Sequence, residues 1–298
     1  MSNIHTFDIP EEWSGITLHT FLRQHLNLSR TGIRSLKRHH ALRVNGHAVT
    51  VRYPLQAGDV LEIAFPETPP QRFVGENIPL DIVYEDGDLI VINKPAGMVV
   101  HPTPKHRSGT LANALRYHWD SRGETAGFHP VHRLDRSTSG LILITKNAWA
   151  HQQLDLQIAS NRIHRLYLVV CEGKPFKPSG RIDAPILSLP ETPKRQIAAS
   201  GRPSVTRYRT LIGSSEASLL AVKIFTGRTH QIRVHLSHTG HPLWGDTLYD
   251  SVHPEFPRPA LHAALLSFIH PKSGKRLRFR AGLPEDFSFL MKNLALKI

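Results

Sequence analysis

Short apolar or alternating segments recur along most of this chain, and few helical patterns separate them. Beyond residue 80 the strand-like segments are Ile82 to Tyr84, Leu89 to Ile92, Leu141 to Ile144, Leu166 to Cys171, Val205 to Leu211, Leu219 to Phe225, Ala264 to Ile269 and Arg276 to Arg280. In this part, helices are expected after Gly109, over about 148–160 and after Gly227. Parallel strands would need a helix in most connections, so the pattern predicts an α+β fold built on a mainly antiparallel mixed sheet.

The chain is long enough, at 298 residues, for one large domain and one small domain. The segment Pro66 to Gln71 contains three prolines among polar residues and interrupts every periodic pattern. Proline stiffens such a connection. We therefore expect a small domain over 1–66, a semi-rigid linker over 67–79 and a large domain over 80–298.

The small domain is predicted to contain two helices and a hairpin. Apolar residues recur at helical spacing over 18–26, and Ser29 is a suitable N-cap for a second helix. The dipeptide Asn45-Gly46 tolerates the positive φ angles of a tight turn between two short strands. The second helix would carry a basic stripe made of Arg30, Arg34, Lys37 and Arg38. Such a stripe either binds phosphates or is a solvated face, and the absence of acidic residues over 30–38 leaves the two interpretations level.

The net charge of the chain indicates a polyanionic partner. Lys and Arg number 37 against 24 Asp and Glu, which gives a formal charge of +13. Nucleic acid is the first candidate, because basic side chains neutralise phosphates and release counterions. A membrane is a weak second, since the longest apolar runs, such as Leu166 to Cys171, fall far short of the roughly 18 residues that span a bilayer.

Cysteine and histidine usage argues against structural metals and disulfides. Cys171 is the single cysteine, which excludes an internal disulfide and cysteine-based zinc patterns. The 20 histidines are scattered, and none stands in a His-Glu-x-x-His arrangement. The N-terminus does not resemble a secretory signal. We expect a cytoplasmic protein with no metal, no cofactor and no obligate protein partner.

One charged loop is a candidate for chemistry. In His132-Arg133-Leu134-Asp135-Arg136, a carboxylate lies between two arginines and just ahead of the apolar run Leu141 to Ile144. Arginines keep a nearby carboxylate ionised, and an apolar wall limits the access of water. Asp135 is therefore a candidate reactive group, and a structural ion-pair network is the alternative interpretation.

Two further segments carry candidate residues. The cluster Gly227 to His235 is predicted to run from a strand through a glycine turn into a helix, with Arg228 and Gln231 near one helix face. Arg228 and Arg233 would bind phosphate or pair with an active-site carboxylate, or else are surface arginines. Alternation along the strand at 165–170 puts Tyr167 on the same face as Arg165. Tyr167 could stack on a base, and a core tyrosine is the alternative.

Taken together, these motifs resemble the RluA-type family of RNA pseudouridine synthases. In chain order they are Asn93-Lys94-Pro95-Ala96-Gly97, His132-Arg133-Leu134-Asp135 with Thr138-Ser139-Gly140, Arg165-x-Tyr167, Gly227 to His235, and Gly240-His241-Pro242-Leu243-Trp244-Gly245-Asp246. The resemblance covers about residues 80 to 290 and implies a catalytic domain of the pseudouridine synthase type. The segment 14–66 resembles the small RNA-binding module first known from ribosomal protein S-four, which often accompanies the ribosomal large-subunit branch of the family. Arg165 stands where the family often has lysine.

The resemblance implies roles for individual residues. Asp135 would be the catalytic carboxylate, attacking the uracil ring or the anomeric carbon of the ribose, or assisting proton removal from the sugar. Tyr167 would stack on the target base and help to remove the proton left on the new ring carbon. Arg233 would pair with Asp135, and Arg133 would take the place of the extracted uridine. Arg228, His132 and His230 would make phosphate or site-supporting contacts.

The implied activity is the isomerisation of uridines to pseudouridine in structured RNA, with large-subunit ribosomal RNA as the first expectation. Transfer RNA is one alternative substrate. A non-catalytic RNA-binding or ribosome-assembly factor is an alternative from another class. A Ser/His/Asp hydrolase has little support because no Gly-x-Ser-x-Gly segment is present.

Overall fold

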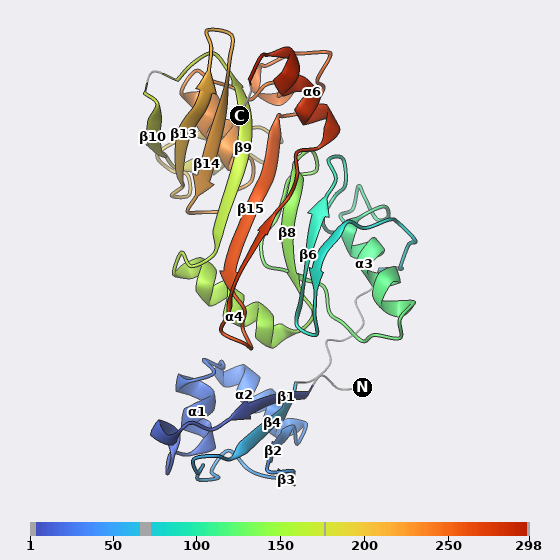
Figure 1. Cartoon of the computed structure of the whole chain (residues 1–298), viewed down its shortest axis with the longest axis vertical. Coiled ribbons are helices and arrows are strands. Elements are labelled where there is room, and N and C mark those ends of the chain that lie inside the picture. Colours follow the sequence, from blue (N-terminus) through green and yellow to red (C-terminus); the bar gives the residue numbers. More distant parts are fainter. Residues whose placement is uncertain (1–3, 66–72, 176, 297–298) are drawn as a thin grey trace.

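The computed structural model describes residues 4–65, 73–175 and 177–296 (Figure 1). An N-terminal unit contains a four-stranded sheet of order β1-β4-β2-β3. Its elements are β1 (Ile4–Asp8), η1 (Glu11–Trp13), α1 (Leu18–Gln24), α2 (Arg30–Arg38), β2 (Leu42–Val44), β3 (His47–Ala48) and β4 (Val60–Ala64). The two predicted helices and the predicted hairpin are present.

Local sequence explains these elements. The Ser29 hydroxyl accepts a hydrogen bond from the Gly32 N–H at 3.0 Å, which caps the N-terminus of α2. Asn45 and Gly46 have φ angles of 51° and 79°, as the turn between β2 and β3 requires. Strand β1 was not predicted from the sequence. It pairs antiparallel with β4, which is more than fifty residues away in the chain.

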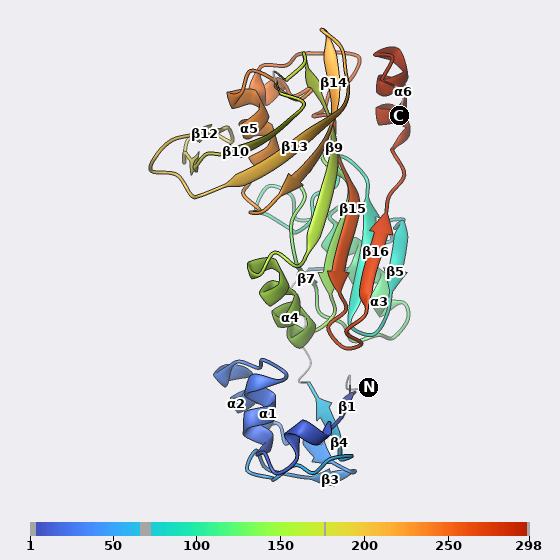
Figure 2. The ribbon, with the colours of Figure 1, turned by 60° about the vertical axis from the view of Figure 1, so that its left-hand side comes forward.

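The larger part of the chain forms a ten-stranded sheet (Figures 1 and 2). Its main path is β10-β13-β14-β9-β15-β8-β6-β5, while β16 pairs with β15 and β7 pairs with β8. These strands are β5 (Ile82–Glu85), β6 (Leu89–Lys94), β7 (His129–Pro130), β8 (Ser139–Thr145), β9 (His164–Glu172), β10 (Ser179–Asp183), β13 (Val205–Gly213), β14 (Ala217–Ile224), β15 (Leu261–Ile269) and β16 (Arg276–Arg280). A separate hairpin consists of β11 (Ile186–Ser188) and β12 (Arg195–Ile197).

In the part of the chain that the structure describes, four α-helices and one short 3-10 helix accompany this sheet. They are α3 (Leu111–Asp120), α4 (Ala148–Ala159), α5 (Gln231–His238), η2 (Thr247–Tyr249) and α6 (Glu285–Asn293). Among the described residues one strand pair, β8 with β15, is parallel and the others are antiparallel. The predicted α+β fold with a mainly antiparallel mixed sheet is confirmed. None of the helices in the described segments is long and apolar enough to cross a membrane.

The parallel contact between β8 and β15 depends on Gly140. Only two residue pairs join these strands, His262 with Ser139 and Ala263 with Gly140. Gly140 has a φ angle of 108°, and a Cβ atom there would lie 2.6 Å from the Ala263 nitrogen. Only glycine allows this approach. The loop that carries Asp135 therefore enters the sheet at a point where two strands can touch closely.

The N-terminal unit packs against α4. Trp149, 3% exposed, belongs to the same hydrophobic cluster as the core of the unit and stacks on Phe65 with ring centroids 5.6 Å apart. The side-chain amide of Gln153 donates to the Leu26 carbonyl at 2.7 Å. Both whole-chain views place α4 at the end of the large sheet nearest to this unit (Figures 1 and 2). The unit is thus held by direct contacts in addition to the connecting chain.

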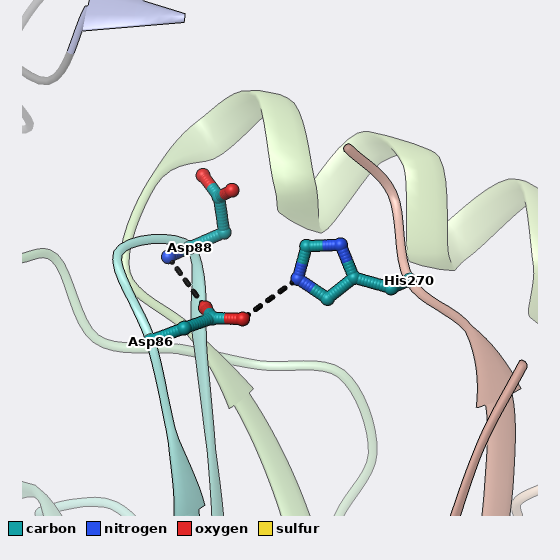
Figure 3. Close-up of side chains that lie close together, drawn as sticks. All are labelled: Asp86, Asp88 and His270. Atoms are coloured by element: carbon teal, nitrogen blue, oxygen red, sulfur yellow. Dashed lines mark hydrogen bonds and ion pairs between the residues drawn. The ribbon is translucent and has the colours of Figure 1, made fainter. Parts of the chain in front are cut away.

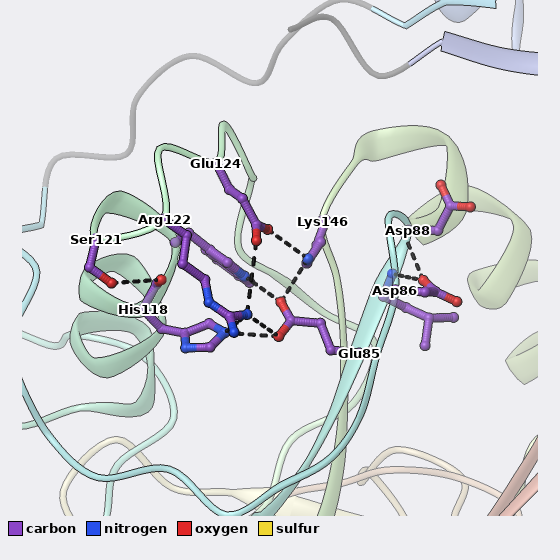
Figure 4. Close-up of polar contacts among 10 residues, drawn as sticks. Glu85, Asp86, Asp88, His118, Ser121, Arg122, Glu124 and Lys146 are labelled. Carbon is purple, nitrogen blue, oxygen red and sulfur yellow. Dashed lines mark hydrogen bonds and ion pairs between the residues drawn. The ribbon is translucent and has the colours of Figure 1, made fainter.

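Two polar networks brace the sheet near this contact. His5 of β1 lies with its Nε2 3.1 Å from the Asp88 carboxylate. Glu85 of β5 receives Lys146 Nζ at 2.7 Å and His118 Nε2 at 2.8 Å (Figure 4). Burial alone would raise the pKa of Glu85, but the hydrogen bonds from Lys146 and His118 outweigh it, and the pKa is lowered. Glu85 therefore stays ionised and ties β5 to α3 and to the chain ahead of α4.

The predicted linker falls partly outside the described residues, since 67–72 are not described. The following residues do not form a free spacer. Phe73 and Leu80 pack against the main hydrophobic core, and the Asn113 side chain donates to the Val74 carbonyl at 2.8 Å. Residues 73–80 are therefore better described as part of the larger unit than as a linker.

Candidate active site

A cavity of about 410 Å³ opens where the loop before β8, the strand β9 and the N-terminal end of α5 meet. The predicted catalytic residues Asp135, Tyr167 and Arg233 all line it. Its remaining lining residues are Pro130 to Leu134, Thr138, Asp155, Ile158, Arg165, Ile224, Gly227 to Ile232 and Leu261. Three segments that lie far apart in the sequence thus contribute to one site.

Asp135 lies among positive charges but is mostly removed from water. Its side chain is 27% exposed, and one carboxylate oxygen is 3.9 Å from Arg233 Nη1. Desolvation raises the pKa of Asp135, while the charges of Arg233, Arg133 and Lys94 and a hydrogen bond from the His230 N–H lower it, with a net rise. The sequence predicted that nearby arginines keep the carboxylate ionised. These charges do lower the pKa, but burial outweighs them, so the pKa of Asp135 lies above its ordinary value.

The two arginines beside Asp135 in the sequence point elsewhere. Arg133 donates from Nη2 to the Thr229 hydroxyl at 3.0 Å, and Arg136 donates from Nε to the Gly97 carbonyl at 3.1 Å. Both side chains are exposed. Both residues belong to the segment 131–138 between β7 and β8, which carries the candidate residue Asp135 and is called the catalytic loop below. Arg133 lies at the boundary between this loop and the 227–229 turn, where an incoming nucleic acid strand can reach it.

Arg233 makes its shortest contacts with Asp246, a residue to which the sequence alone assigned no role. It donates to both oxygens of Asp246, at 2.7 Å from Nε and 2.6 Å from Nη2. Asp246 is 1% exposed, so this pair is buried. The predicted pairing with Asp135 is present as a longer ion pair, and Asp246 is the group that orients the guanidinium.

Tyr167 and Arg165 lie on one face of β9, as alternation predicted, and both line the cavity. They are 4% and 8% exposed. Burial raises the pKa of Tyr167, so its hydroxyl is held in the neutral form. Arg165 Nε has no hydrogen-bond partner among the described residues. A buried guanidinium with a free donor beside a tyrosine ring is suited to a polar, planar ligand.

Lys94 joins the catalytic loop to the neighbouring segment 95–98 through hydrogen bonds to carbonyl groups of both. This residue is fully buried at 0% exposure, and its Nζ donates to the carbonyls of Pro95 at 2.7 Å, Met98 at 2.9 Å and Arg136 at 3.3 Å. Burial lowers the pKa of Lys94 to about 7. Lys94 stood in one of the quoted motifs, but a lysine in a sequence gives no sign that its ammonium group is enclosed by carbonyls.

The helix α5 begins at Gln231, so the prediction that Arg228 lies on this helix is wrong. The Gln231 side chain explains the difference, because its oxygen accepts from the Arg228 N–H at 3.1 Å and from the Thr226 hydroxyl at 2.7 Å. These bonds fix a turn before the helix. His230 in this turn has a left-handed φ of 57°, and burial lowers its pKa to about 4. Arg228 is exposed at the cavity rim.

His132 is neutral and turned into the fold. It is 6% exposed, and its Nε2 accepts from the Leu143 N–H at 3.3 Å. Burial lowers the pKa of His132 to about 3. A neutral ring offers no charge to a phosphate, so of the two predicted roles the site-supporting one fits the geometry. His132 links the catalytic loop to β8.

The basic stripe of α2 is fully on the surface. Arg30, Arg34, Lys37 and Arg38 are all exposed, and among the described residues none of them pairs with a carboxylate. The other face of the helix buries Ile33 and Leu36. Four unpaired positive charges on one helix are available to an anionic partner.

One group of side chains in the described parts of the chain is close enough to hold a metal ion: Asp86, Asp88 and His270 (Figure 3). Hydrogen bonding argues against that role. His270 Nδ1 accepts from the N–H groups of Lys272 at 3.2 Å and Ser273 at 3.1 Å, so Nε2 carries the proton and donates to Asp86 at 2.8 Å. A metal would have to displace that proton. We assign these residues to the support of the β5–β6 turn.

Comparison with known proteins identifies the family. Residues 88–238 match the model of the RNA pseudouridylate synthase family, and residues 5–61 match that of the RluD ribosomal pseudouridine synthase N-terminal domain. YjbO of Bacillus subtilis, named an uncharacterized RNA pseudouridine synthase, is 41% identical over 84% of this chain and 89% of its own length. Ribosomal large subunit pseudouridine synthase D of Zymomonas mobilis is 40% identical over 85% of both chains.

A solved structure is also similar to this chain. Human RNA pseudouridylate synthase domain containing 1 superimposes with a TM-score of 0.57 and 29% identity, over 70% of this chain and 86% of the human chain. The family model covers more than half of the sequence, and its matched segment includes Asp135, Tyr167 and Arg233. The chain belongs to the RNA pseudouridine synthase family, and it is an isomerase that acts on RNA.

Proposed function

We propose that this protein converts specific uridines of large-subunit ribosomal RNA to pseudouridine, with Asp135 as the reactive carboxylate. The observation that carries the proposal is the meeting of Asp135, Tyr167 and Arg233 in one cavity, although they come from three distant segments. Relatives that cover most of the chain carry the name ribosomal large subunit pseudouridine synthase D, which favours ribosomal over transfer RNA as the substrate.

The reaction exchanges one bond of the uridine for another. The bond between the ribose and the ring nitrogen breaks, the uracil turns within the cavity, and a bond forms to a ring carbon. The proton on that carbon is lost, and the freed nitrogen gains one. Asp135 either forms a covalent bond to the substrate or takes a proton from the sugar, and both routes need its ionised form.

The remaining residues would hold the base and keep water out. Tyr167 supplies a flat apolar surface for stacking, and its raised pKa favours that role over proton removal. Leu134, Ile224 and Leu261 give the cavity apolar walls. A detached uracil must not be lost to hydrolysis, so this enclosure is part of the function. Arg133 at the rim would fill the space that the extruded uridine leaves.

The N-terminal unit would supply affinity. Its stripe of Arg30, Arg34, Lys37 and Arg38 is exposed and unpaired among the described residues, and the unit packs directly against α4. RNA phosphates are the matching partner. Replacing the four side chains by alanine is expected to weaken RNA binding and flatten its salt dependence, while the rate at saturating RNA stays the same.

Mapping of pseudouridine in ribosomal and transfer RNA, with and without the protein, tests the proposal. We expect new pseudouridine at one or a few ribosomal positions. Modification of transfer RNA alone would contradict the assigned substrate. If the wild-type protein binds RNA but modifies none of it, the non-catalytic assembly role is correct instead.

A further inference from the structure

A second cavity, of about 460 Å³, lies directly beside the active-site cavity. The two share Arg133, Gly227, Arg228 and Thr229, so the Arg133–Thr229 hydrogen bond belongs to the wall between them. The other lining residues come from the β11–β12 hairpin and the segment after it: Ile186, Leu187, Ser188, Arg195, Ser200, Gly201 and Arg202.

Four guanidinium groups and no carboxylate line this second cavity, which we call the arginine pocket: Arg133, Arg195, Arg202 and Arg228. Within the described residues, none of the four forms an ion pair with an acidic side chain. Other arginines of the chain do pair, as Arg181 does with Asp183 at 2.6 Å and Arg258 with Asp286 at 2.6 Å. A concave surface that gathers unpaired arginines repels cations and attracts anions.

The pocket is preorganised by the way in which the hairpin is fastened to α5. Ile186 and Ile197 pack with Val234 of α5 and with Tyr249 in a small hydrophobic cluster. The Arg195 N–H donates to the Tyr249 hydroxyl at 2.9 Å. Figure 2 shows β12 beside α5. Because α5 also carries Arg233, the pocket and the catalytic cavity share one rigid support.

Arg202 is fixed in a similar way. Its N–H donates to the Ile186 carbonyl and its carbonyl accepts from the Ile186 N–H, each at 2.9 Å. Gly201 permits this approach, since a Cβ atom there would lie 2.6 Å from the Ile186 carbonyl carbon. The backbone positions of Arg195 and Arg202 are therefore set before any ligand arrives, which reduces the ordering cost of binding.

We propose that the arginine pocket, through Arg195, Arg202 and Arg228, binds phosphodiester groups of the substrate RNA strand immediately next to the target uridine, while Arg133 on the shared wall takes the place of that uridine. This inference rests on the proposed function. A strand that places one nucleotide in the catalytic cavity must pass its neighbouring backbone over the shared wall at Arg133 and Thr229. The planar fork of arginine matches phosphate oxygens, so the pocket fixes the position of the strand while the catalytic cavity receives the base.

A double substitution tests the pocket without touching residues that line the catalytic cavity. Arg195→Ala with Arg202→Ala removes two charges that belong to the arginine pocket alone. The matched control is Arg207→Ala with Arg209→Ala, which removes two exposed arginines of β13 outside both cavities.

We expect the Arg195→Ala, Arg202→Ala variant to raise the KM for an RNA stem-loop substrate by about tenfold or more. The slope of log Kd against log salt should fall by about one to two, since each phosphate contact contributes about one. The kcat value should stay near that of the wild type.

Substitution in the RNA locates the contact. Uncharged methylphosphonate is placed singly at each phosphate on either side of the target uridine. At one or two positions it should weaken binding of the wild type and of the control, but not of the Arg195→Ala, Arg202→Ala variant. Equal losses in all three proteins at every position would overturn the inference, as would a KM for the pocket variant equal to that of the control.

Free inorganic phosphate has the same kind of oxygen atoms as an RNA phosphodiester, so its binding to the arginine pocket is measured separately. If phosphate raises the unfolding temperature of the wild type but not of the pocket variant, while RNA binding is equal in both, the pocket is a free-anion site and the inference fails. Binding and its salt slope are measured without turnover. The binding data alone therefore decide whether the pocket contacts RNA. The proposed function fails instead if the protein binds RNA and no pseudouridine forms.

Discussion

Arg233 donates two hydrogen bonds to the buried carboxylate of Asp246, at 2.6 and 2.7 Å, and lies 3.9 Å from Asp135. The guanidinium is therefore oriented by Asp246 and approaches Asp135, the proposed catalytic carboxylate, through Nη1. Because Asp246 already engages Arg233, the contact with Asp135 is the longer of the two. In the proposed reaction, Asp246 would hold Arg233 in place while Asp135 reacts.

Asp246→Asn tests this separation. Removing one partner of a buried pair leaves an uncompensated charge, so the free energy of unfolding should fall by about 3–5 kcal/mol. Denaturant unfolding measures it. In the control, Asp183→Asn breaks the exposed Arg181 pair and should cost about 0–1 kcal/mol. Under conditions where both variants are folded, kcat should fall for Asp246→Asn alone. Equal stabilities would show that the Arg233–Asp246 pair is not structurally important.

The raised pKa of Asp135 predicts an unusual pH dependence. Only the ionised carboxylate can attack or accept a proton, so kcat rises with pH as Asp135 loses its proton. Because burial raises that pKa, the acid limb of the kcat profile should lie above the range of an ordinary aspartate. Arg133→Gln removes a charge that lowers the pKa and should move the limb further up.

Arg136→Gln is the matched control for this pH profile, because Arg136 flanks Asp135 in the sequence yet is not among the main influences on its pKa. Its acid limb should coincide with that of the wild type when kcat is measured at saturating RNA. An acid limb at the position of an exposed aspartate in the wild type would contradict the role of burial.

Lys94→Met tests whether catalysis requires the hydrogen bonds that Lys94 makes to the catalytic loop and to the segment 95–98. Methionine is similar in shape, but it leaves the carbonyls of Pro95, Met98 and Arg136 without a buried donor. It also removes a charge that lowers the pKa of Asp135, so kcat is compared on the plateau above the acid limb of each protein. A displacement of the catalytic group by about 1 Å can cost about a hundredfold in rate, so kcat should fall by about that factor with a smaller change in KM.

Lys146→Met is the comparison for Lys94→Met. Lys146 is also buried, but it pairs with Glu85 at 2.7 Å, away from the catalytic loop (Figure 4). The Lys146→Met substitution should lower the free energy of unfolding and leave kcat of the folded enzyme unchanged. A Lys94→Met variant with wild-type kcat would show that the loop keeps its position without this ammonium group.

Trp149→Ala tests the contact between the N-terminal unit and α4. The ring packs against Phe65 and His5, so its loss should cost about 3–5 kcal/mol and release the unit. We expect a larger radius of gyration in solution scattering and weaker RNA binding. Leu154→Ala on the same helix faces the large sheet instead and should lower stability without either effect. Unchanged scattering for Trp149→Ala would mean that other contacts hold the unit.

Features set by local chemistry were predictable from the sequence. The cap at Ser29, the Asn45-Gly46 turn and the helix over 148–159 each depend on residues within one or two turns of chain, and all are present. The fold class was predictable for a related reason, since alternation with few helices allows few layer arrangements. The residues themselves made Asp135, Arg233 and Tyr167 candidates, each with a structural alternative, and the resemblance assigned their catalytic roles.

Features set by distant contacts were not predictable. Strand β1 exists because β4 pairs with it, and the β11–β12 hairpin exists because Tyr249 and α5 hold it. Arg228 was placed on a helix because spacing alone does not reveal that the Gln231 side chain stabilises the preceding turn. The partner of Arg233 and the raised pKa of Asp135 depend on burial, which sequence position does not specify.

The proposed role of Asp135 is tested by measuring pseudouridine formation by Asp135→Asn on the RNA that the wild type modifies. The substitution keeps the size of the side chain and removes the reactive carboxylate. We predict normal RNA affinity and no detectable pseudouridine. At neutral pH the unfolding temperature should not fall, because the raised pKa of Asp135 means that its ionisation destabilises the folded state. Pseudouridine formation at the wild-type rate by a folded Asp135→Asn protein would show that Asp135 is not the reactive carboxylate.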